Sequence, residues 1–129
     1  MIALDTNILV RFLTRDNEAE YRASEKLISS ADIFIPDSVI LETEWVLRYA
    51  YDLTAAEICG ALRKLFGLEN VHLSDGEKIA RAIDWCEAGL DFADALHLTH
   101  SLECDSLKTF DKAFIKKAKG RSSCRVDKP

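Results

Sequence analysis

Short apolar stretches of strand length alternate with longer stretches of helical periodicity along the whole chain. The apolar stretches predict strands at residues 1–4, 32–36, 70–73, 106–110 and 123–126, the last as an edge strand. The periodic stretches predict helices at residues 7–13, 19–31, 37–53, 54–67, 74–89, 91–103 and 111–120. We expect the first strand to be buried, because residues 1–4 read as a continuous apolar run.

Two helix starts carry the spacing of a capping box, in which a hydroxyl and a glutamate three residues later satisfy each other's backbone groups. Thr54 precedes Glu57, and Ser74 precedes Glu77, in this spacing. Gly89 is expected to end the helix that begins near Ser74, since glycine readily adopts the left-handed conformation at a helix end.

Strands separated by helices predict right-handed crossovers and a mostly parallel sheet. The expected fold is α/β, a three-layer α/β/α sandwich with a mostly parallel central sheet, formed as a single domain over residues 1–129. Such sheets bind ligands beyond the carboxyl ends of their strands. Asp5 and Asp111 both follow an apolar strand directly, so each is either a turn residue or part of a site at this edge.

The helix at residues 37–53 carries two glutamates with different expected roles. On a helical projection, Glu42 falls inside the apolar arc that contains Val39 and Val46. Glu44 falls on the opposite flank, where Arg48 is its natural ion-pair partner four residues later. A carboxylate on a core-facing stripe is unfavourable unless it is paired, protonated or bound to a cation. Glu42 is therefore the candidate site residue, and Glu44 is expected in a surface ion pair.

Two aspartates begin the predicted helix at residues 91–103. Asp91 is the expected N-cap, and Asp94 lies in the first turn, where an acid also favours the positive helix end. If the strands bring Asp94 together with Asp5, Glu42 and Asp111, four carboxylates would share one pocket. Their repulsion would raise pKa values or require cations, and oxygen-only ligands suit Mg²⁺ or Mn²⁺ better than zinc.

The charge of the chain is distributed unevenly. The formal net charge is −5, yet residues 107–129 carry eight Lys or Arg and two Asp, which is a net charge of +6. The other 106 residues carry nine basic and twenty acidic side chains, a net charge of −11. This asymmetry is typical of a polyanion contact on an acidic body, and equally of a solvated basic helix.

The composition of the chain argues against a membrane-spanning or secreted protein. No apolar run approaches the roughly 20 residues of a membrane span, and no signal peptide is recognisable at the N-terminus. We expect a soluble cytoplasmic protein without membrane contact. The four cysteines are scattered without a C-x-x-C pair, so we expect free thiols that mostly fill the core.

Four motifs in order, LDTNIL, SVILETEWVLRYAY, DFADALHL and TFDKAF, resemble the PIN domain family and more closely its VapC-type toxin ribonucleases. The resemblance covers nearly the whole chain. It implies that the catalytic and metal-binding acids are Asp5, Glu42, Asp94 and Asp111. It also implies supporting positions at Thr6, Thr109 and, in a second tier, Asp91.

The resemblance further implies an activity and its partners. One or two Mg²⁺ or Mn²⁺ ions would activate water for hydrolysis of RNA phosphodiesters. A small antitoxin protein and a homodimer are expected, because VapC-type toxins commonly have both. Basic side chains of the C-terminal segment are candidates for contacting the RNA backbone, namely Lys108, Lys112, Lys116 and Lys117.

Three alternatives remain open on sequence alone. A PIN-type nuclease could process RNA without any toxin role. A phosphotransfer domain could use Asp5 as phosphoacceptor, although the DTN motif lacks a second acid two residues on. A non-catalytic binding module would use the acids only as caps and surface charges.

Overall fold

The computed structural model describes residues 1–129 and separates into two compact units, Met1–Gly76 and Glu77–Pro129. The expectation of a single domain over the chain stays a prediction.

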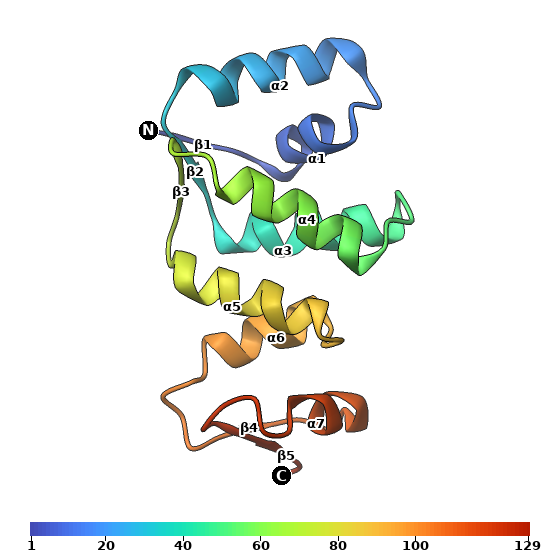
Figure 1. Ribbon diagram of the computed structural model, residues 1–129, viewed down its shortest axis with the longest axis vertical. Helices are drawn as coiled ribbons and strands as arrows, with labels where there is room; N and C mark the ends of the chain where they lie inside the picture. Colours follow the sequence, from blue (N-terminus) through green and yellow to red (C-terminus); the bar gives the residue numbers. More distant parts are fainter. The chain divides into compact units, whose positions relative to one another are not determined.

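The first unit contains a three-stranded parallel sheet in the order β1-β2-β3. Its strands are β1 (Ile2–Ala3), β2 (Ile33–Ile35) and β3 (Val71–Leu73) (Figure 1). In the register, Ile33 of β2 lies between Ile2 and Val71. Asn70 fixes the start of β3, because its side-chain amide donates to the backbone carbonyls of Ile28 at 2.6 Å and Ala31 at 2.8 Å.

Four helices complete this unit: α1 (Thr6–Thr14), α2 (Glu18–Ser30), α3 (Asp37–Tyr49) and α4 (Ala55–Phe66). Helix α1 packs against both α2 and α3, and α4 packs against α3 and β3. The side chains of the core that are almost fully buried are Leu9, Ile33, Ile35, Ile40, Leu47, Ile58, Leu62 and Leu65. The predicted capping box of Thr54 and Glu57 is formed, with both reciprocal hydrogen bonds present.

The second unit consists of three helices and a two-stranded parallel sheet. Its elements are α5 (Gly76–Glu87), α6 (Phe92–Thr99), β4 (Ser106–Lys108), α7 (Lys112–Ala118) and β5 (Arg125–Asp127). Figure 1 shows α7 beside the β4–β5 pair, and α7 packs on β5. The aliphatic and aromatic core of the unit includes Ile79, Ile83, Phe92 and Leu98.

Helix α5 shows how one local prediction succeeded at one end and failed at the other. Gly89 has φ +114°, and the N–H groups of Gly89 and Leu90 donate to the carbonyls of Cys86 and Trp85, both at 3.0 Å. This pair of bonds is a Schellman motif, so the glycine stop is confirmed. The helix begins at Gly76, however, and Asp75 rather than Ser74 precedes its first residue.

Two further predictions need correction. Residues Ile2 and Ala3 of β1 are exposed, and Leu4 is the one of the first four residues that is buried. Helix α3 ends at Tyr49 instead of continuing to residue 53. Asp52 adopts φ +57°, a left-handed conformation that stops the helical path.

Five strands and seven helices lie where the sequence pattern predicts them. None of the helices combines the length and apolar character that crossing a membrane requires. All four cysteines are free thiols; three are buried and Cys104 is exposed, which agrees with the predicted role of core filling.

Candidate functional site

Asp5 lies at the junction between β1 and α1. Its side chain is the N-cap of α1 and accepts a hydrogen bond from the backbone N–H of Thr6 at 2.8 Å. The residue is exposed, as expected for an acid at the carboxyl end of a strand. A capping role and a ligand role are compatible here, since capping engages one carboxylate oxygen.

Thr6 connects this corner to α3. Its side chain is buried, with 7% of the residue exposed, and its hydroxyl donates a hydrogen bond to the carboxylate of Glu42. The bond joins the first residue of α1 to the second turn of α3. Within the first unit, the structure therefore brings together three residues that the sequence singled out, Asp5, Thr6 and Glu42.

The predicted faces of α3 are wrong, although the pairing of Glu44 is right. Glu42 is exposed, whereas Glu44 is 3% exposed and forms an ion pair with Arg48, Nε to Oε2 2.9 Å. The buried face of α3 follows Ile40, Thr43, Glu44 and Leu47, the ordinary spacing of a core-facing helix. The helical projection from the sequence centres the buried face of α3 on Val39, one residue away from Ile40.

A groove of about 410 Å³ runs between α1 and α3. The residues that line it are Asp5, Thr6, Asn7, Val10, Arg11, Glu42, Val46, Ala50 and Tyr51. Asp5 and Thr6 lie at the start of α1, and Glu42 lies in the second turn of α3. The aliphatic side chains come from Val10 of α1, Val46 of α3 and Ala50 at the C-cap of α3. Asp5 and Glu42 therefore open onto a groove within the size range of small-ligand sites.

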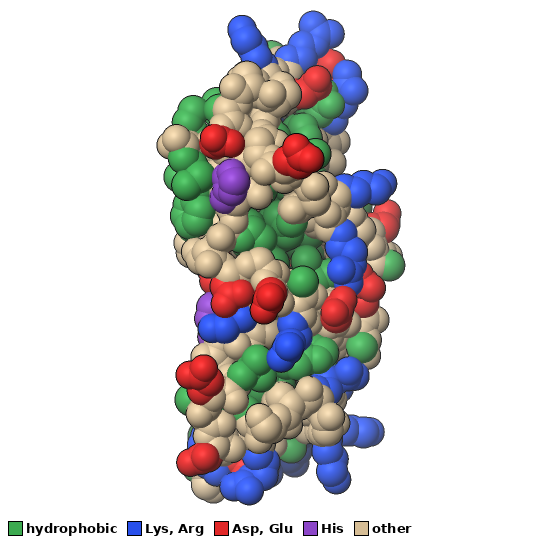
Figure 2. All heavy atoms as spheres, turned by 60° about the vertical axis from the view of Figure 1, so that its left-hand side comes forward, with side chains coloured by type: hydrophobic (Ala, Val, Ile, Leu, Met, Phe, Trp, Pro, Cys, Tyr) green, Lys and Arg blue, Asp and Glu red, His purple; other side chains and the backbone are tan.

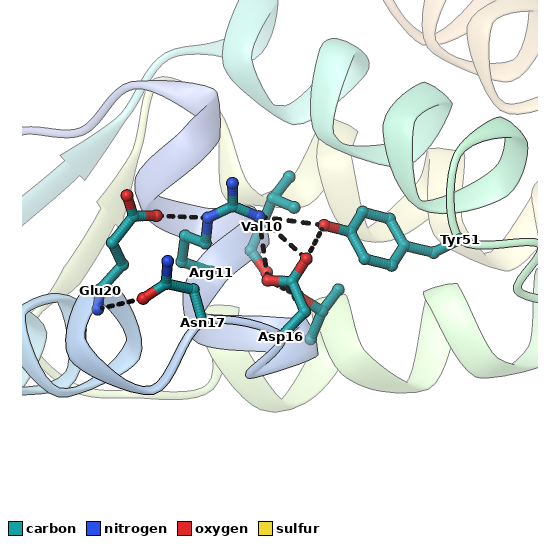
Figure 3. Close-up of polar contacts among 7 residues, drawn as sticks. Val10, Arg11, Asp16, Asn17, Glu20 and Tyr51 are labelled. Carbon is teal, nitrogen blue, oxygen red and sulfur yellow. Dashed lines mark hydrogen bonds and ion pairs between the residues drawn. The ribbon is translucent and has the colours of Figure 1, made fainter.

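Sequence reasoning missed the polar cluster around Arg11. The Arg11 guanidinium binds the Asp16 carboxylate through Nη1 at 2.9 and 3.0 Å, and its Nε donates to Glu20. The Tyr51 hydroxyl donates to Asp16 and accepts from Arg11 Nη1 at 3.1 Å, as Figure 3 shows. A charged residue inside the apolar stretch NILVRFL was the signal that could have found this cluster.

The hydrogen bonds of this cluster stabilise the charged forms of its side chains. Those that Arg11 donates to Glu20 and Asp16 raise the pKa of Arg11. The hydrogen bond from Tyr51 is the main cause that lowers the pKa of Asp16, and Arg11 adds to it. Both charges are therefore maintained at neutral pH, and Tyr51 is held at the end of the groove by two hydrogen bonds.

The second unit gathers the other predicted acids. Asp91 is the N-cap of α6 and accepts from the N–H of Asp94 at 3.2 Å. Asp111 is the N-cap of α7, accepting from Phe114 at 3.1 Å, and its own N–H donates to the Thr109 hydroxyl at 3.0 Å. These local bonds confirm Asp91 as the N-cap and place Thr109 as a support of the turn before Asp111.

Asp94 is the acid of this unit whose pKa is raised. Burial raises the pKa of its carboxyl, and the negative charges of Asp91 and Asp111 raise it further. His97 and Lys117 act in the opposite direction with smaller effect. The like charges around Asp94 are therefore incompletely compensated by the protein itself.

Basic side chains gather over the C-terminal segment, at the lower end of the view in Figure 2. Lys108 forms an ion pair with Asp127 at 2.6 Å, and Arg125 binds the same carboxylate at 2.8 Å. Lys112, Lys116 and Lys117 are exposed on α7. These three lysines carry no ion pair and keep their charge available to a polyanion.

The candidate acids have the chemistry that a divalent metal ion needs, without forming one assembled cluster. No group of three or more His, Cys, Asp or Glu side chains is placed to hold one. Asp5 and Glu42 belong to the first unit, and Asp94 and Asp111 to the second. The donors in each unit are carboxylate oxygens, the chemistry that Mg²⁺ and Mn²⁺ prefer, and the raised pKa of Asp94 marks negative charge that a cation would relieve. The donor chemistry fits, and the four-acid cluster stays a prediction.

The model of the PIN domain family matches residues 2–120. The match spans most of the chain, so the chain belongs to the PIN domain family. PIN domains are generally nucleases that bind divalent metal ions. The parallel strands and seven helices are consistent with the three-layer α/β/α PIN fold, which confirms the predicted fold class. No curated protein matches the chain.

Proposed function

We propose that this PIN domain is a Mg²⁺- or Mn²⁺-dependent endoribonuclease of the VapC type, acting as the toxin of a toxin–antitoxin pair. The observation that carries the nuclease part is the Asp5–Thr6–Glu42 corner. It places two carboxylates of a PIN domain at the carboxyl end of β1, on the groove between α1 and α3.

The acids would hold the metal and the hydroxyls would orient the acids. Asp5, Glu42, Asp94 and Asp111 are the proposed ligands, directly or through water. A bound divalent ion would lower the pKa of a water and offset charge that develops on the phosphate. Thr6 restricts the rotation of Glu42 by its hydrogen bond, as an orienting partner of a metal ligand does.

RNA is the proposed substrate, and α7 is its proposed electrostatic contact. Lys112 and Lys116 are four residues apart and so lie on one face of α7, with Lys117 beside them. Three free ammonium groups on an otherwise acidic chain supply the attraction that a phosphodiester backbone needs. Lys108 is a secondary contact, because Asp127 already engages its charge.

The toxin role is supported by the resemblance of the four motifs to VapC-type toxins. It implies a small antitoxin that blocks the enzyme, a homodimer, and action in the cytoplasm where RNA is available. Expression without an antitoxin should therefore arrest growth of a bacterial host, and Asp5→Asn should relieve the arrest. Growth arrest that persists in Asp5→Asn would contradict a toxin that acts by cleavage.

Cleavage of labelled single-stranded and structured RNA tests the enzyme directly. Activity should require Mg²⁺ or Mn²⁺ and disappear with chelator. Asp5→Asn and Glu42→Gln should each reduce kcat by at least about 100-fold, an ordinary loss when a metal ligand or its geometry is removed. Glu69→Gln removes one exposed acid outside the groove and should leave activity unchanged.

Three outcomes would redirect the assignment. Cleavage without growth arrest would favour an RNA-processing nuclease. A trapped aspartyl-phosphate on Asp5 would favour phosphotransfer. Absence of cleavage together with melting temperatures that do not respond to divalent ions would favour a binding module.

A further inference from the structure

The groove between α1 and α3 has chemically distinct ends. Asp5, Thr6 and Glu42 form its acidic end, while Arg11 and Tyr51 belong to its other end. Glu42, Val46 and Ala50 follow one another at four-residue spacing, so about 12 Å of helical rise separates the first from the last. A ligand that reaches the acidic end with one group can therefore place a neighbouring group near Tyr51.

We propose that the Tyr51 end of this groove is a subsite for one nucleobase of the RNA, next to the phosphate handled by Asp5 and Glu42. This inference rests on the proposed function for its role in cleavage. Tyr51 is the residue that contacts the base, and Arg11 and Asp16 are positioning residues that hold its ring.

The hydrogen bonds of Tyr51 commit its hydroxyl and leave its ring for stacking. The hydroxyl donates to Asp16 and accepts from Arg11 at 3.1 Å. Figure 3 shows the ring extending from the chain toward this pair, with Val10 beside Arg11. An aromatic ring held in place before binding loses less conformational entropy when a base stacks on it.

The charge of this end selects against a phosphate and accepts a base. The single positive charge of Arg11 is already matched by two carboxylates, those of Asp16 and Glu20. A phosphate here would meet a net negative cluster, whereas a nucleobase is neutral and planar. The aliphatic lining from Val10, Val46 and Ala50 provides apolar contact for such a ring.

The groove has room for a base beside its acidic end. Its whole volume of about 410 Å³ lies within the range for small-ligand sites. Stacking on an aromatic side chain tolerates any base, because every base has a π-face. The subsite therefore predicts a requirement for a base at one position, with preference among bases set by ring size.

The first experiment uses adenosine and ribose as probes, so that neither phosphate nor metal contributes. Adenosine titrated into isotope-labelled full-length protein should shift the amide resonances of Val10, Val46 and Ala50, and ribose should not. Tyr51→Leu should weaken adenosine binding about tenfold or more, the range for loss of one base–aromatic stack. Tyr49→Leu is the matched control, since Tyr49 is exposed, packs on Trp45 and is outside the groove lining.

Tyr51→Phe separates stacking from mere structural support. It keeps the ring and loses both hydroxyl bonds, so adenosine should bind about threefold more weakly while the ring still contributes. In RNA cleavage, Tyr51→Leu should raise KM about tenfold and change kcat less than twofold. A structural role alone would instead lower the active fraction, which reduces kcat and leaves KM unchanged.

Two results would overturn the subsite: equal shifts by adenosine and ribose, or adenosine affinity unchanged in folded Tyr51→Leu. If Tyr51→Leu loses the amide spectrum of the folded protein, Tyr51→Phe is the deciding variant. Unchanged adenosine affinity in Tyr51→Phe would overturn the proposal that the two hydroxyl hydrogen bonds hold the ring for stacking. If adenosine binds as expected but no RNA is cut, the proposed nuclease function fails and the base subsite stands.

Discussion

The two glutamates of α3 should respond oppositely to loss of charge. Glu44 is buried and forms an ion pair with Arg48, whereas Glu42 is exposed at the groove and accepts a hydrogen bond from Thr6. Glu44→Gln should therefore reduce stability with little effect on the chemistry of the folded protein. Glu42→Gln should abolish cleavage with little effect on stability, because its amide oxygen still accepts from Thr6.

The expected destabilisation follows from the burial of each partner. Removing one partner of a fully buried ion pair costs about 3–5 kcal/mol. The Arg48 side chain is 32% exposed, so water solvates part of its charge after the change. We therefore expect Glu44→Gln to lower the free energy of unfolding by about 2 kcal/mol, the range for a hydrogen bond to a charged group. For Glu42→Gln the change should stay within about 0.5 kcal/mol, as for most surface substitutions.

Thermal and chemical denaturation measure this difference. At about 2.1 cal/mol/K of unfolding entropy per residue, 2 kcal/mol corresponds to a fall in Tm of roughly 7 °C for this chain. Urea titration should give the same ordering of midpoints with an unchanged slope. Arg48→Met and the double variant Glu44→Gln/Arg48→Met complete a cycle that isolates the energy of the pair.

Two results would refute this assignment of faces. One is an equal fall in Tm for Glu42→Gln and Glu44→Gln. The other is a Glu44→Gln protein that keeps its Tm but loses cleavage, because the catalytic glutamate would then be the buried one.

Two further outcomes follow from the second unit. In the presence of chelator, Asp94→Asn should stabilise the protein near pH 7 and lose that advantage toward pH 3. The pKa of Asp94 is raised in the folded protein, so the wild type loses stability as the pH rises through that pKa. An asparagine carries no charge and avoids this loss. Denaturation at the two pH values measures it, and a variant less stable than wild type at pH 7 would contradict it. A thiol reagent should label Cys104 first, since the other three cysteines are buried; mass spectrometry after brief labelling checks this, and early modification of Cys124 would contradict it.

Periodicity and capping chemistry predicted most of the local structure. Strand and helix positions follow from alternating apolar runs. The helix starts at Asp91 and Thr54 and the helix end at Gly89 use side chains or conformations with few alternatives. These signals are local, so one sequence suffices to read them. Burial of β1 is not readable in this way, because it depends on which elements of the fold cover the strand.

The errors around the groove share one physical cause. A helical projection assumes where the buried face of a helix is centred and where the helix ends. For α3, the sequence pattern predicts both positions incorrectly. The helix ends at Tyr49, before the left-handed residue Asp52, which takes Tyr51 off the helix and lets its hydroxyl reach Asp16 and Arg11. The cluster around Arg11 therefore depends on a backbone turn that periodicity does not encode. Glu44 can be buried because its ion pair with Arg48 compensates its charge in the protein interior.

Local structure explains some of the predicted acids better than others. Asp5, Asp91 and Asp111 each cap a helix, so their presence would be justified in a protein without any active site. Glu42 and Asp94 cap nothing. Asp94 is half-buried beside two other acids, which raises its pKa, and Glu42 is held by a buried threonine at the edge of a groove. A carboxyl held among other acids, as Asp94 is, is expected where stability is traded for function. Glu42 contributes little to stability and lines the groove, so the fold alone does not account for it either. Glu42 and Asp94, more than the conspicuous aspartate at the start of the chain, are thus the residues that the proposed catalysis explains better than local structure does.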